Sequence, residues 1–133
     1  MLRIGPDVHR QIVGHCLDRL PEEACGLLAG PPGDSRAEVC YPVTNVDHSA
    51  RTYRLDPLEH LRADRDADER GLEVIGVFHS HTHTDAYPSD TDVERAPDPS
   101  WHYVLVSLRH GEAVVRSFRI EEGRITEEPV VAQ

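Results

Sequence analysis

An apolar run of seven residues, LEVIGVF (72–78), leads directly into the polar stretch HSHTHTDAYPSDTD (79–92). The β-branched and aromatic residues of this run predict a buried strand, and its length and its flanking Gly71 fit a strand better than a helix. A strand this apolar is expected in the centre of a sheet. The chain must therefore fold around a central strand that has several histidines at one end.

The rest of the chain predicts a mixed arrangement of helices and strands around that strand. The expected elements are helices at 6–20, 56–70 and 88–96 and strands at 24–30, 37–43, 51–55, 102–108, 112–120 and 124–131, with the last two strands joined by a hairpin at EEGR. The helix at 56–70 has a thin apolar side and is expected on the surface. This order is not a regular alternation of strand and helix, which argues against a doubly wound fold and favours one α/β domain over 1–133.

Composition limits the compartment and the partners. The net charge is −10 and the isoelectric point is about 5.2, and an acidic surface argues against nucleic acids or anionic membranes as partners. No apolar run approaches the ~20 residues that a membrane span needs, and the opening MLRIGPDVHRQ is too polar for a signal peptide. Cys16, Cys25 and Cys40 form no CxxC pair, so we expect a reducing, cytoplasmic compartment.

The polar stretch after the central strand contains metal-binding residue types. His79 and His81 are two residues apart, so in extended chain both imidazoles point the same way and can hold one ion. Asp92 follows on the expected short helix, from which its carboxylate can reach back. Two histidines and one carboxylate leave a fourth position for water, as in catalytic zinc sites. Surface decoration is the competing interpretation, and His83 stays open between a substrate contact and a surface residue.

Hydrolysis at such a site needs a base that takes the proton of the attacking water. The segment LPEEACGLLAG offers two carboxylates, Glu22 and Glu23, directly before an apolar strand. A carboxylate that borders a buried segment is costly unless it reaches solvent or has a role. One of the two can face the metal while the other is exposed, and the residues alone do not decide which.

Together these residues resemble the motif of the JAMM (MPN+) zinc metalloproteases. His79-x-His81, seven residues, Ser89, two residues and Asp92 form the family pattern, and PEEACGLL is similar to the segment that holds the family's upstream glutamate. The resemblance covers nearly the whole chain, and the alignment selects Glu23 as that glutamate. Five spaced positions are all filled, which makes the motif highly specific.

The resemblance implies a fold, a cofactor and roles for these residues. The implied fold is a single cytidine-deaminase-like (JAMM/MPN) domain, with a curved mixed β-sheet flanked by helices. The implied cofactor is one zinc ion per chain, held by the two histidines and the aspartate of the motif. Glu23 would act as general base and then as general acid, and Ser89 would stabilise the oxyanion of the tetrahedral intermediate.

Within the family the chain looks most like the small Mec subfamily, through EACGLLAG, TNVDHSARTYRLDP and HYVLVSL. This similarity implies hydrolysis of the amide bond between the C-terminal Gly-Gly of a ubiquitin-like sulfur-carrier protein and an attached cysteine or short extension. Cysteine is released, as in cysteine biosynthesis, and the carrier is regenerated. One alternative is a JAMM peptidase for another protein or a small amide. The other is a non-catalytic, zinc-stabilised carrier-binding module, although a structural zinc would need neither Glu23 nor Ser89.

The carrier tail is expected to bind in extended form, as an added strand in a narrow groove that glycines suit. TNVDHSARTYRLDP is the candidate wall of this groove, and its Arg51 and Arg54 are candidates for contacts with carrier acids or with a terminal carboxylate. His83 is a third candidate for substrate contact. A solvated side chain is the competing interpretation for each arginine. The oligomeric state stays open between a monomer and a homodimer.

Overall fold

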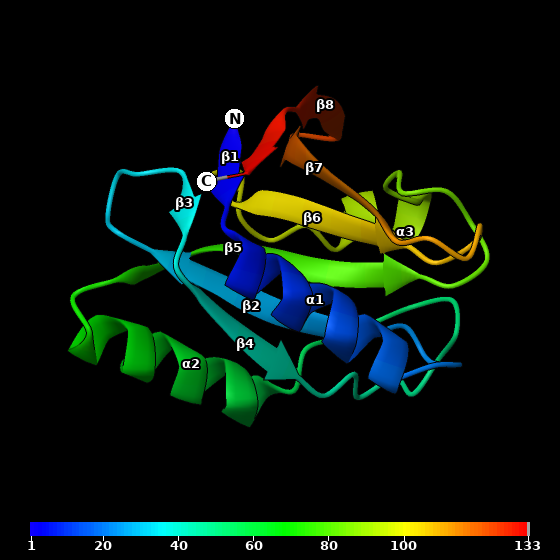
Figure 1. Ribbon diagram of the computed structural model, residues 1–133, viewed down its shortest axis with the longest axis horizontal. Helices are drawn as coiled ribbons and strands as arrows, with labels where there is room; N and C mark the ends of the chain where they lie inside the picture. Colours follow the sequence, from blue (N-terminus) through cyan, green and yellow to red (C-terminus); the bar gives the residue numbers. More distant parts are fainter. Residues whose placement is uncertain (133) are drawn as a thin grey trace.

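The structure is a computed structural model that describes residues 1–132, and it consists of two sheets with helices packed against them (Figure 1). The strands are β1 (Leu2–Ile4), β2 (Cys25–Gly30), β3 (Arg36–Ala37), β4 (Val39–Val43), β5 (Glu73–His81), β6 (His102–Ser107), β7 (Val114–Glu121), β8 (Arg124–Glu128) and β9 (Val130–Ala132). The helices are α1 (Pro6–Asp18), α2 (Pro57–Glu69) and α3 (Asp90–Glu94). In the described part of the chain, no helix is long and apolar enough to cross a membrane.

The larger sheet has the strand order β4-β2-β5-β6-β7-β8, which places β5 in its interior. β5 pairs antiparallel with β2 and parallel with β6. The central strand expected at 72–78 is therefore confirmed, but β5 continues to His81, so His79 and His81 belong to the strand instead of following it. Because β5 and β6 are parallel, their carboxyl ends lie at one edge of the sheet, and both histidines lie at that edge.

Helices α1 and α2 cover opposite faces of this sheet. Neighbouring side chains of β5 point to opposite faces: Phe78 packs in one hydrophobic cluster with Ile12 of α1, and Val77 packs in the other with Ala63 of α2. Figure 1 shows α1 in front of the sheet. Since side chains two residues apart share a face, the two histidines of β5 lie on the same side as Val77 and α2.

The two long helices begin within one residue of the predicted positions and end within two, whereas α3 is two residues shorter at each end than the helix expected at 88–96. Pro6 and Pro57 occupy first-turn positions, where their fixed φ suits a helix and no N–H is lost. The Asp56 side chain caps α2 by accepting hydrogen bonds from two backbone N–H groups. Only Ala63 and Ala67 of α2 are buried, which confirms the thin apolar side expected for this helix.

The smaller sheet, with the order β3-β1-β9, was not expected from the sequence. β1 has three residues, too few for a periodic pattern, and its partners lie far away in the chain. The single strand expected at 124–131 is wrong, because the chain leaves the larger sheet after Glu128 and enters the smaller one as β9 past Pro129. Proline has no N–H for a sheet ladder, so the break falls at that residue. The strand expected at 37–43 is likewise divided, into β3 and β4.

The strand expected at 51–55 is also wrong. Within that segment the structure has one isolated bridge, between Asn45 and Leu55, and the chain from 46 to 54 forms a loop. The alternation of RTYRL imitates a strand, but the backbone N–H of Arg54 bonds to the side chain of Asn45 instead of a neighbouring strand. This loop lies beside His79 of β5, on which its Tyr53 ring stacks.

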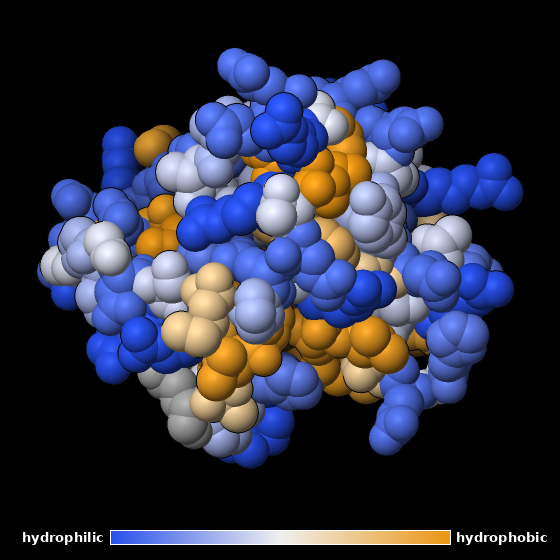
Figure 2. Space-filling view, turned by 90° about the horizontal axis from the view of Figure 1, so that it is seen from above, coloured by the Kyte–Doolittle hydropathy of each residue, from blue (hydrophilic) through white to orange (hydrophobic). Residues whose placement is uncertain are grey.

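The hairpin expected at EEGR is confirmed. β7 and β8 pair antiparallel up to Glu121 and Arg124, so the connection has two residues. Glu122 and Gly123 both have positive φ, 50° and 77°, which a two-residue loop with the twist of the flanking strands requires. On the surface, Figure 2 shows a mostly hydrophilic face with hydrophobic residues gathered in a few patches.

Candidate metal centre and its flanking pockets

Three potential ligand atoms meet at the carboxyl end of β5. The Nε2 atoms of His79 and His81 lie 3.2 Å apart, and Oδ2 of Asp92 lies 3.1 Å from the first and 3.0 Å from the second. Both histidines are buried. The structure thus brings together the three residues that the sequence predicts as a metal site, and together they can hold one ion.

Asp92 is held in place by the first turn of α3. Its backbone N–H donates to Ser89 Oγ over 3.1 Å, and its Oδ2 accepts from the Ser89 backbone N–H over 2.9 Å. This reciprocal capping box fixes both side chains at once. Ser89 is therefore the N-cap of α3, and it lies next to the cluster of His79, His81 and Asp92.

The donor set fits a divalent metal ion such as zinc. His81 Nδ1 lies 2.8 Å from the backbone oxygen of Asp85 and donates to it, which leaves the Nε2 lone pair free for a metal. Burial holds the pKa of His79 below its usual value, which favours the neutral ligand form. Burial acts to raise the pKa of Asp92, but hydrogen bonds with both histidines outweigh it and keep this pKa below its usual range. The pKa of His81 is raised, because bonds to Asp92 and Asp85 exceed the effect of burial.

Glu23 is the buried carboxyl next to this cluster. Its side chain is 4% exposed, and within residues 1–132 its Oε1 has no hydrogen-bond partner. Burial raises its pKa to about 8; attraction to His81 opposes this rise and repulsion from Asp92 adds to it. Glu22 instead lies 3.8 Å from Arg19 and 3.4 Å from His48. Of the two glutamates, Glu23 lines a pocket together with His81 and Ser89, and Glu22 does not line that pocket.

Asn45 organises the loop that covers this site, and sequence reasoning missed it. Its buried Nδ2 donates to the backbone oxygens of Glu23 and Thr52, each over 3.0 Å. Its Oδ1 accepts from the backbone N–H groups of Asp47 and Arg54. One side chain thus ties the start of β2 to the loop at 46–54. The asparagine in TNVD resembles an ordinary turn residue, and no spacing in the sequence reveals these distant partners.

Tyr53 is the second missed residue, and it lies against a histidine of the candidate metal cluster. Its ring stacks on His79 with 4.2 Å between ring centroids and an interplanar angle of 21°. The stack restricts the orientation of the imidazole. Tyr53 sits in the segment expected to be a strand, so sequence reasoning placed its ring in a sheet and not against the site.

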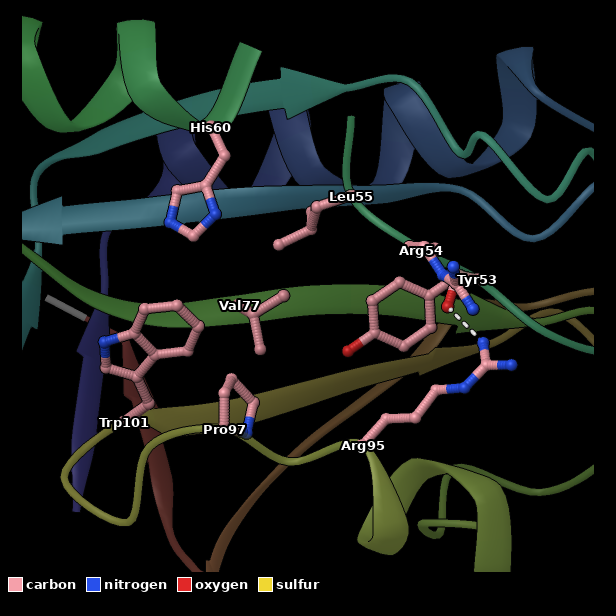
Figure 3. Close-up of a pocket in the computed structure, with 8 residues that line it drawn as sticks. All are labelled: Tyr53, Arg54, Leu55, His60, Val77, Arg95, Pro97 and Trp101. Atoms are coloured by element: carbon pink, nitrogen blue, oxygen red, sulfur yellow. Dashed lines mark hydrogen bonds between the residues drawn. The ribbon is translucent and has the colours of Figure 1, made fainter. Parts of the chain in front are cut away.

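Two pockets flank the cluster along β5. The pocket named here the Val77 pocket has a volume of about 470 Å³. It is lined by Tyr53, Arg54, Leu55, His60, Val77, Arg95, Pro97 and Trp101. Figure 3 shows Tyr53, Arg54 and Arg95 at one end and His60 and Trp101 at the other, with Arg95 bonded to the backbone oxygen of Tyr53.

The second pocket, named here the Glu23 pocket, has a volume of about 570 Å³. It is lined by Glu23, Ala50, Arg51, His81, Thr82, His83, Thr84 and Ser89. Val77, His79 and His81 follow one another on one face of β5, so the two pockets lie on opposite sides of the cluster along the strand. The structure separates the residues expected to contact substrate: Arg51 and His83 line the Glu23 pocket, and Arg54 lines the Val77 pocket.

The sequence is similar to a prokaryotic protein family and to named members of it. The family profile described as prokaryotic homologues of the JAB domain matches residues 5–121. The chain is 48% identical to the CysO-cysteine peptidase of Mycobacterium tuberculosis (strain ATCC 25618 / H37Rv) over 134 residues, which cover 98% of this chain and 90% of the relative. It is 33% identical to the desampylase of Haloferax volcanii over 111 residues, which cover 80% of each chain.

Solved structures share the fold. The solution structure of protein DSY2949 from Desulfitobacterium hafniense has a TM-score of 0.91 and 37% identity, and covers 100% of this chain and 93% of that one. A structure described as a JAMM metalloprotease-like zinc site in the proteasome and signalosome has a TM-score of 0.64 and 14% identity, with 100% and 98% covered. At that identity the second likeness shows the fold alone. The mixed α/β fold implied by the resemblance is confirmed.

Proposed function

The chain belongs to the family of prokaryotic JAB-domain proteins and is a JAMM-type hydrolase, and we propose that it removes a C-terminal residue from a ubiquitin-like sulfur carrier. The bond cleaved is the amide between the carrier's terminal Gly-Gly and an attached cysteine or short extension. Cysteine and the free carrier are the products. The observation that carries the choice of substrate is the 48% identity, over 98% of the chain, to a CysO-cysteine peptidase.

The proposed cofactor is one zinc ion per chain, held by His79, His81 and Asp92. Their donor atoms all lie within 4.8 Å of one another, and two imidazoles with one carboxylate are a ligand set of catalytic zinc sites. When bound, zinc supplies Lewis acidity that polarises the scissile carbonyl and lowers the pKa of a water molecule. Tyr53 stacks on one of these imidazoles and limits its rotation.

Glu23 is the proposed proton carrier. Its carboxylate takes the proton of the attacking water, and it then delivers that proton to the nitrogen of the leaving residue as the C–N bond breaks. The unpartnered Oε1 is the atom available for this transfer. A raised pKa, about 8 in the metal-free chain, makes the protonated acid accessible near neutral pH. A cation at the neighbouring cluster would favour the ionised form, so the same group can serve as base and as acid.

Ser89 is the proposed donor to the oxyanion of the tetrahedral intermediate. Its Oγ accepts the hydrogen bond from the backbone N–H of Asp92, so capping occupies a lone pair and leaves the hydroxyl hydrogen free to donate. The capping box holds this hydroxyl in place before the reaction starts. A preorganised donor of this kind stabilises developing charge more than a mobile one does.

A second candidate function is the cleavage of a carrier from the lysine side chain of a protein. The 33% identity to a desampylase favours it. Both functions use the same residues for the chemistry and differ in the leaving group. For either one we propose a single catalytic domain over 1–133. The three free, buried cysteines are consistent with the proposed cytoplasmic compartment, in which thiols stay reduced.

The test compares three substrates with zinc-loaded protein. They are a carrier ending in Gly-Gly-Cys, the same carrier joined to a lysine side chain of a second protein, and an unrelated peptide ending in cysteine. Cleavage rates are measured by mass spectrometry, with Glu23→Gln as the inactive control. We expect the first substrate to be cleaved fastest. Faster cleavage of the lysine conjugate would support the second candidate, and cleavage of none would refute both.

A further inference from the structure

The position of Glu23 defines which side of the site receives the leaving residue. The group that protonates the departing nitrogen must lie next to it. Glu23 lines the Glu23 pocket together with His81 and Ser89, and it does not line the Val77 pocket. The leaving residue therefore occupies the Glu23 pocket, and the acyl side of the substrate lies toward Tyr53 and the Val77 pocket.

The Glu23 pocket contains one arginine, and its charge is not neutralised within the described part of the chain. Neither an ion pair nor a side-chain hydrogen bond of the Arg51 guanidinium is present among residues 1–132. The arginines on the other side differ, because Asp47 lies 3.9 Å from Arg54 and 3.0 Å from Arg95. Arg51 is thus the cation that remains available for an anionic ligand next to Glu23.

The backbone of Arg51 is held in place, although its side chain is exposed. The backbone N–H groups of Arg51 and Thr52 both donate to Ser49 Oγ, over 3.0 and 3.2 Å. The hydroxyl of Thr82 donates to the backbone oxygen of Ala50, which joins the loop to the segment after β5. The loop therefore presents Arg51 at a fixed place on the wall of the pocket.

We propose that Arg51 binds the α-carboxylate of the leaving residue and makes the chain selective for substrates that end in a free amino acid. The proposal rests on the proposed function and deepens it. In an amino acid one carbon separates the nitrogen from the carboxylate, so a nitrogen beside Glu23 places the carboxylate in the same pocket. A guanidinium matches a carboxylate with two parallel hydrogen bonds. The hydroxyls of Thr82 and Thr84 give the pocket further polar groups.

This assignment separates the two candidate functions. A lysine side chain in a protein conjugate presents its nitrogen at the end of an alkyl chain and has no carboxylate beside it. Arg51 would then have no anionic partner in the substrate. A carrier with one attached amino acid gives Arg51 a carboxylate at every turnover.

The experiment compares two substrates that differ in one group. One is a Gly-Gly carrier with a C-terminal cysteine, and the other is the same adduct with a C-terminal carboxamide. The ratio of their kcat/KM values is measured for the zinc-loaded wild type, Arg51→Gln and Arg54→Gln. Arg54 lies in the same loop but in the other pocket, so its variant is the matched control for the ratio. A second readout is the Kd of each adduct for the Glu23→Gln protein with and without Arg51→Gln, by calorimetry.

We expect the wild type to prefer the free acid by about tenfold, as for an exposed hydrogen bond between charged groups. Arg51→Gln should bring the kcat/KM ratio and the Kd ratio of the two substrates close to one. Arg54→Gln should keep the kcat/KM preference for the free acid, even if its absolute rate changes. Equal turnover of the two substrates by the wild type, or an unchanged preference in Arg51→Gln, would show that Arg51 does not bind the α-carboxylate. Either result would not affect the proposed function. If neither adduct is cleaved or bound by zinc-loaded protein, the proposed function fails and the role of Arg51 fails with it.

Discussion

Replacing Glu23 by glutamine should stabilise the metal-free protein, by an amount that grows with pH. The carboxyl is 4% exposed, and burial is the main cause that raises its pKa from 4.5 to about 8. The folded chain therefore holds this proton more tightly than the unfolded chain does. Between these two pKa values the folded state loses stability as pH rises, because more protons are bound in the folded state.

The size of the effect follows from the pKa difference. One pKa unit corresponds to about 1.4 kcal/mol. The pKa rises from 4.5, the ordinary value of a glutamate, to about 8 in the folded chain. Between pH 4.5 and about 8, the free energy of unfolding of Glu23→Gln should therefore gain about 1.4 kcal/mol per pH unit over that of the wild type. Above this range the difference should reach a plateau of roughly 5 kcal/mol. Glutamine has a similar shape and no charge at any of these pH values, so the slope isolates the ionisation of Glu23.

Denaturant unfolding followed by circular dichroism measures this slope. Wild type and Glu23→Gln are compared in the presence of a chelator from pH 5 to pH 9, with Glu22→Gln as a control for the general loss of one negative charge. A difference that does not change with pH would refute the reasoning. Added zinc should flatten the slope, because a cation beside Glu23 stabilises its carboxylate.

Three further substitutions test the site. His81→Ala removes one of three ligand atoms, so elemental analysis should find the zinc content reduced from one ion per chain to almost none; an unchanged content would contradict the assignment. Asn45→Ala leaves several backbone groups without partners and should cost about 2–4 kcal/mol in denaturant unfolding, whereas a cost near zero would show that the loop holds without it. Ser89→Ala should lower kcat about 10²–10³-fold and stability by about 1 kcal/mol, and an unchanged kcat would rule out the oxyanion role.

The parts of the fold that were predicted correctly are those with a local signal. The apolar run at 72–78, the helix-starting prolines and the turn at Glu122 and Gly123 each act within a few residues. β1 and β9 have three residues each and pair with one another across the whole chain, so no window of sequence contains their partners. The loop at 46–54 alternates like a strand, and only the side chain of Asn45 shows why it is not one.

The cluster of candidate metal ligands was predictable for a similar reason. A separation of two residues on a strand puts His79 and His81 on one side, and the spacing from Ser89 to Asp92 is that of a helix cap. The prediction of Glu23 over its neighbour came from the family resemblance, and the structure adds that Glu23 is the more buried of the two. The stack of Tyr53 on His79 depends on the path of a loop, and sequence spacing does not report that path.

We propose that this chain hydrolyses the terminal amide of a carrier adduct with a metal and Glu23. The most direct measurement is the intact mass of a Gly-Gly carrier bearing a C-terminal cysteine, before and after incubation with zinc-loaded protein. Parallel samples contain a chelator or the Glu23→Gln variant. We expect the carrier to lose the mass of one cysteine residue in the first sample and to stay unchanged in the other two. Full cleavage by Glu23→Gln, or an intact adduct in the presence of zinc-loaded wild type, would contradict this proposal.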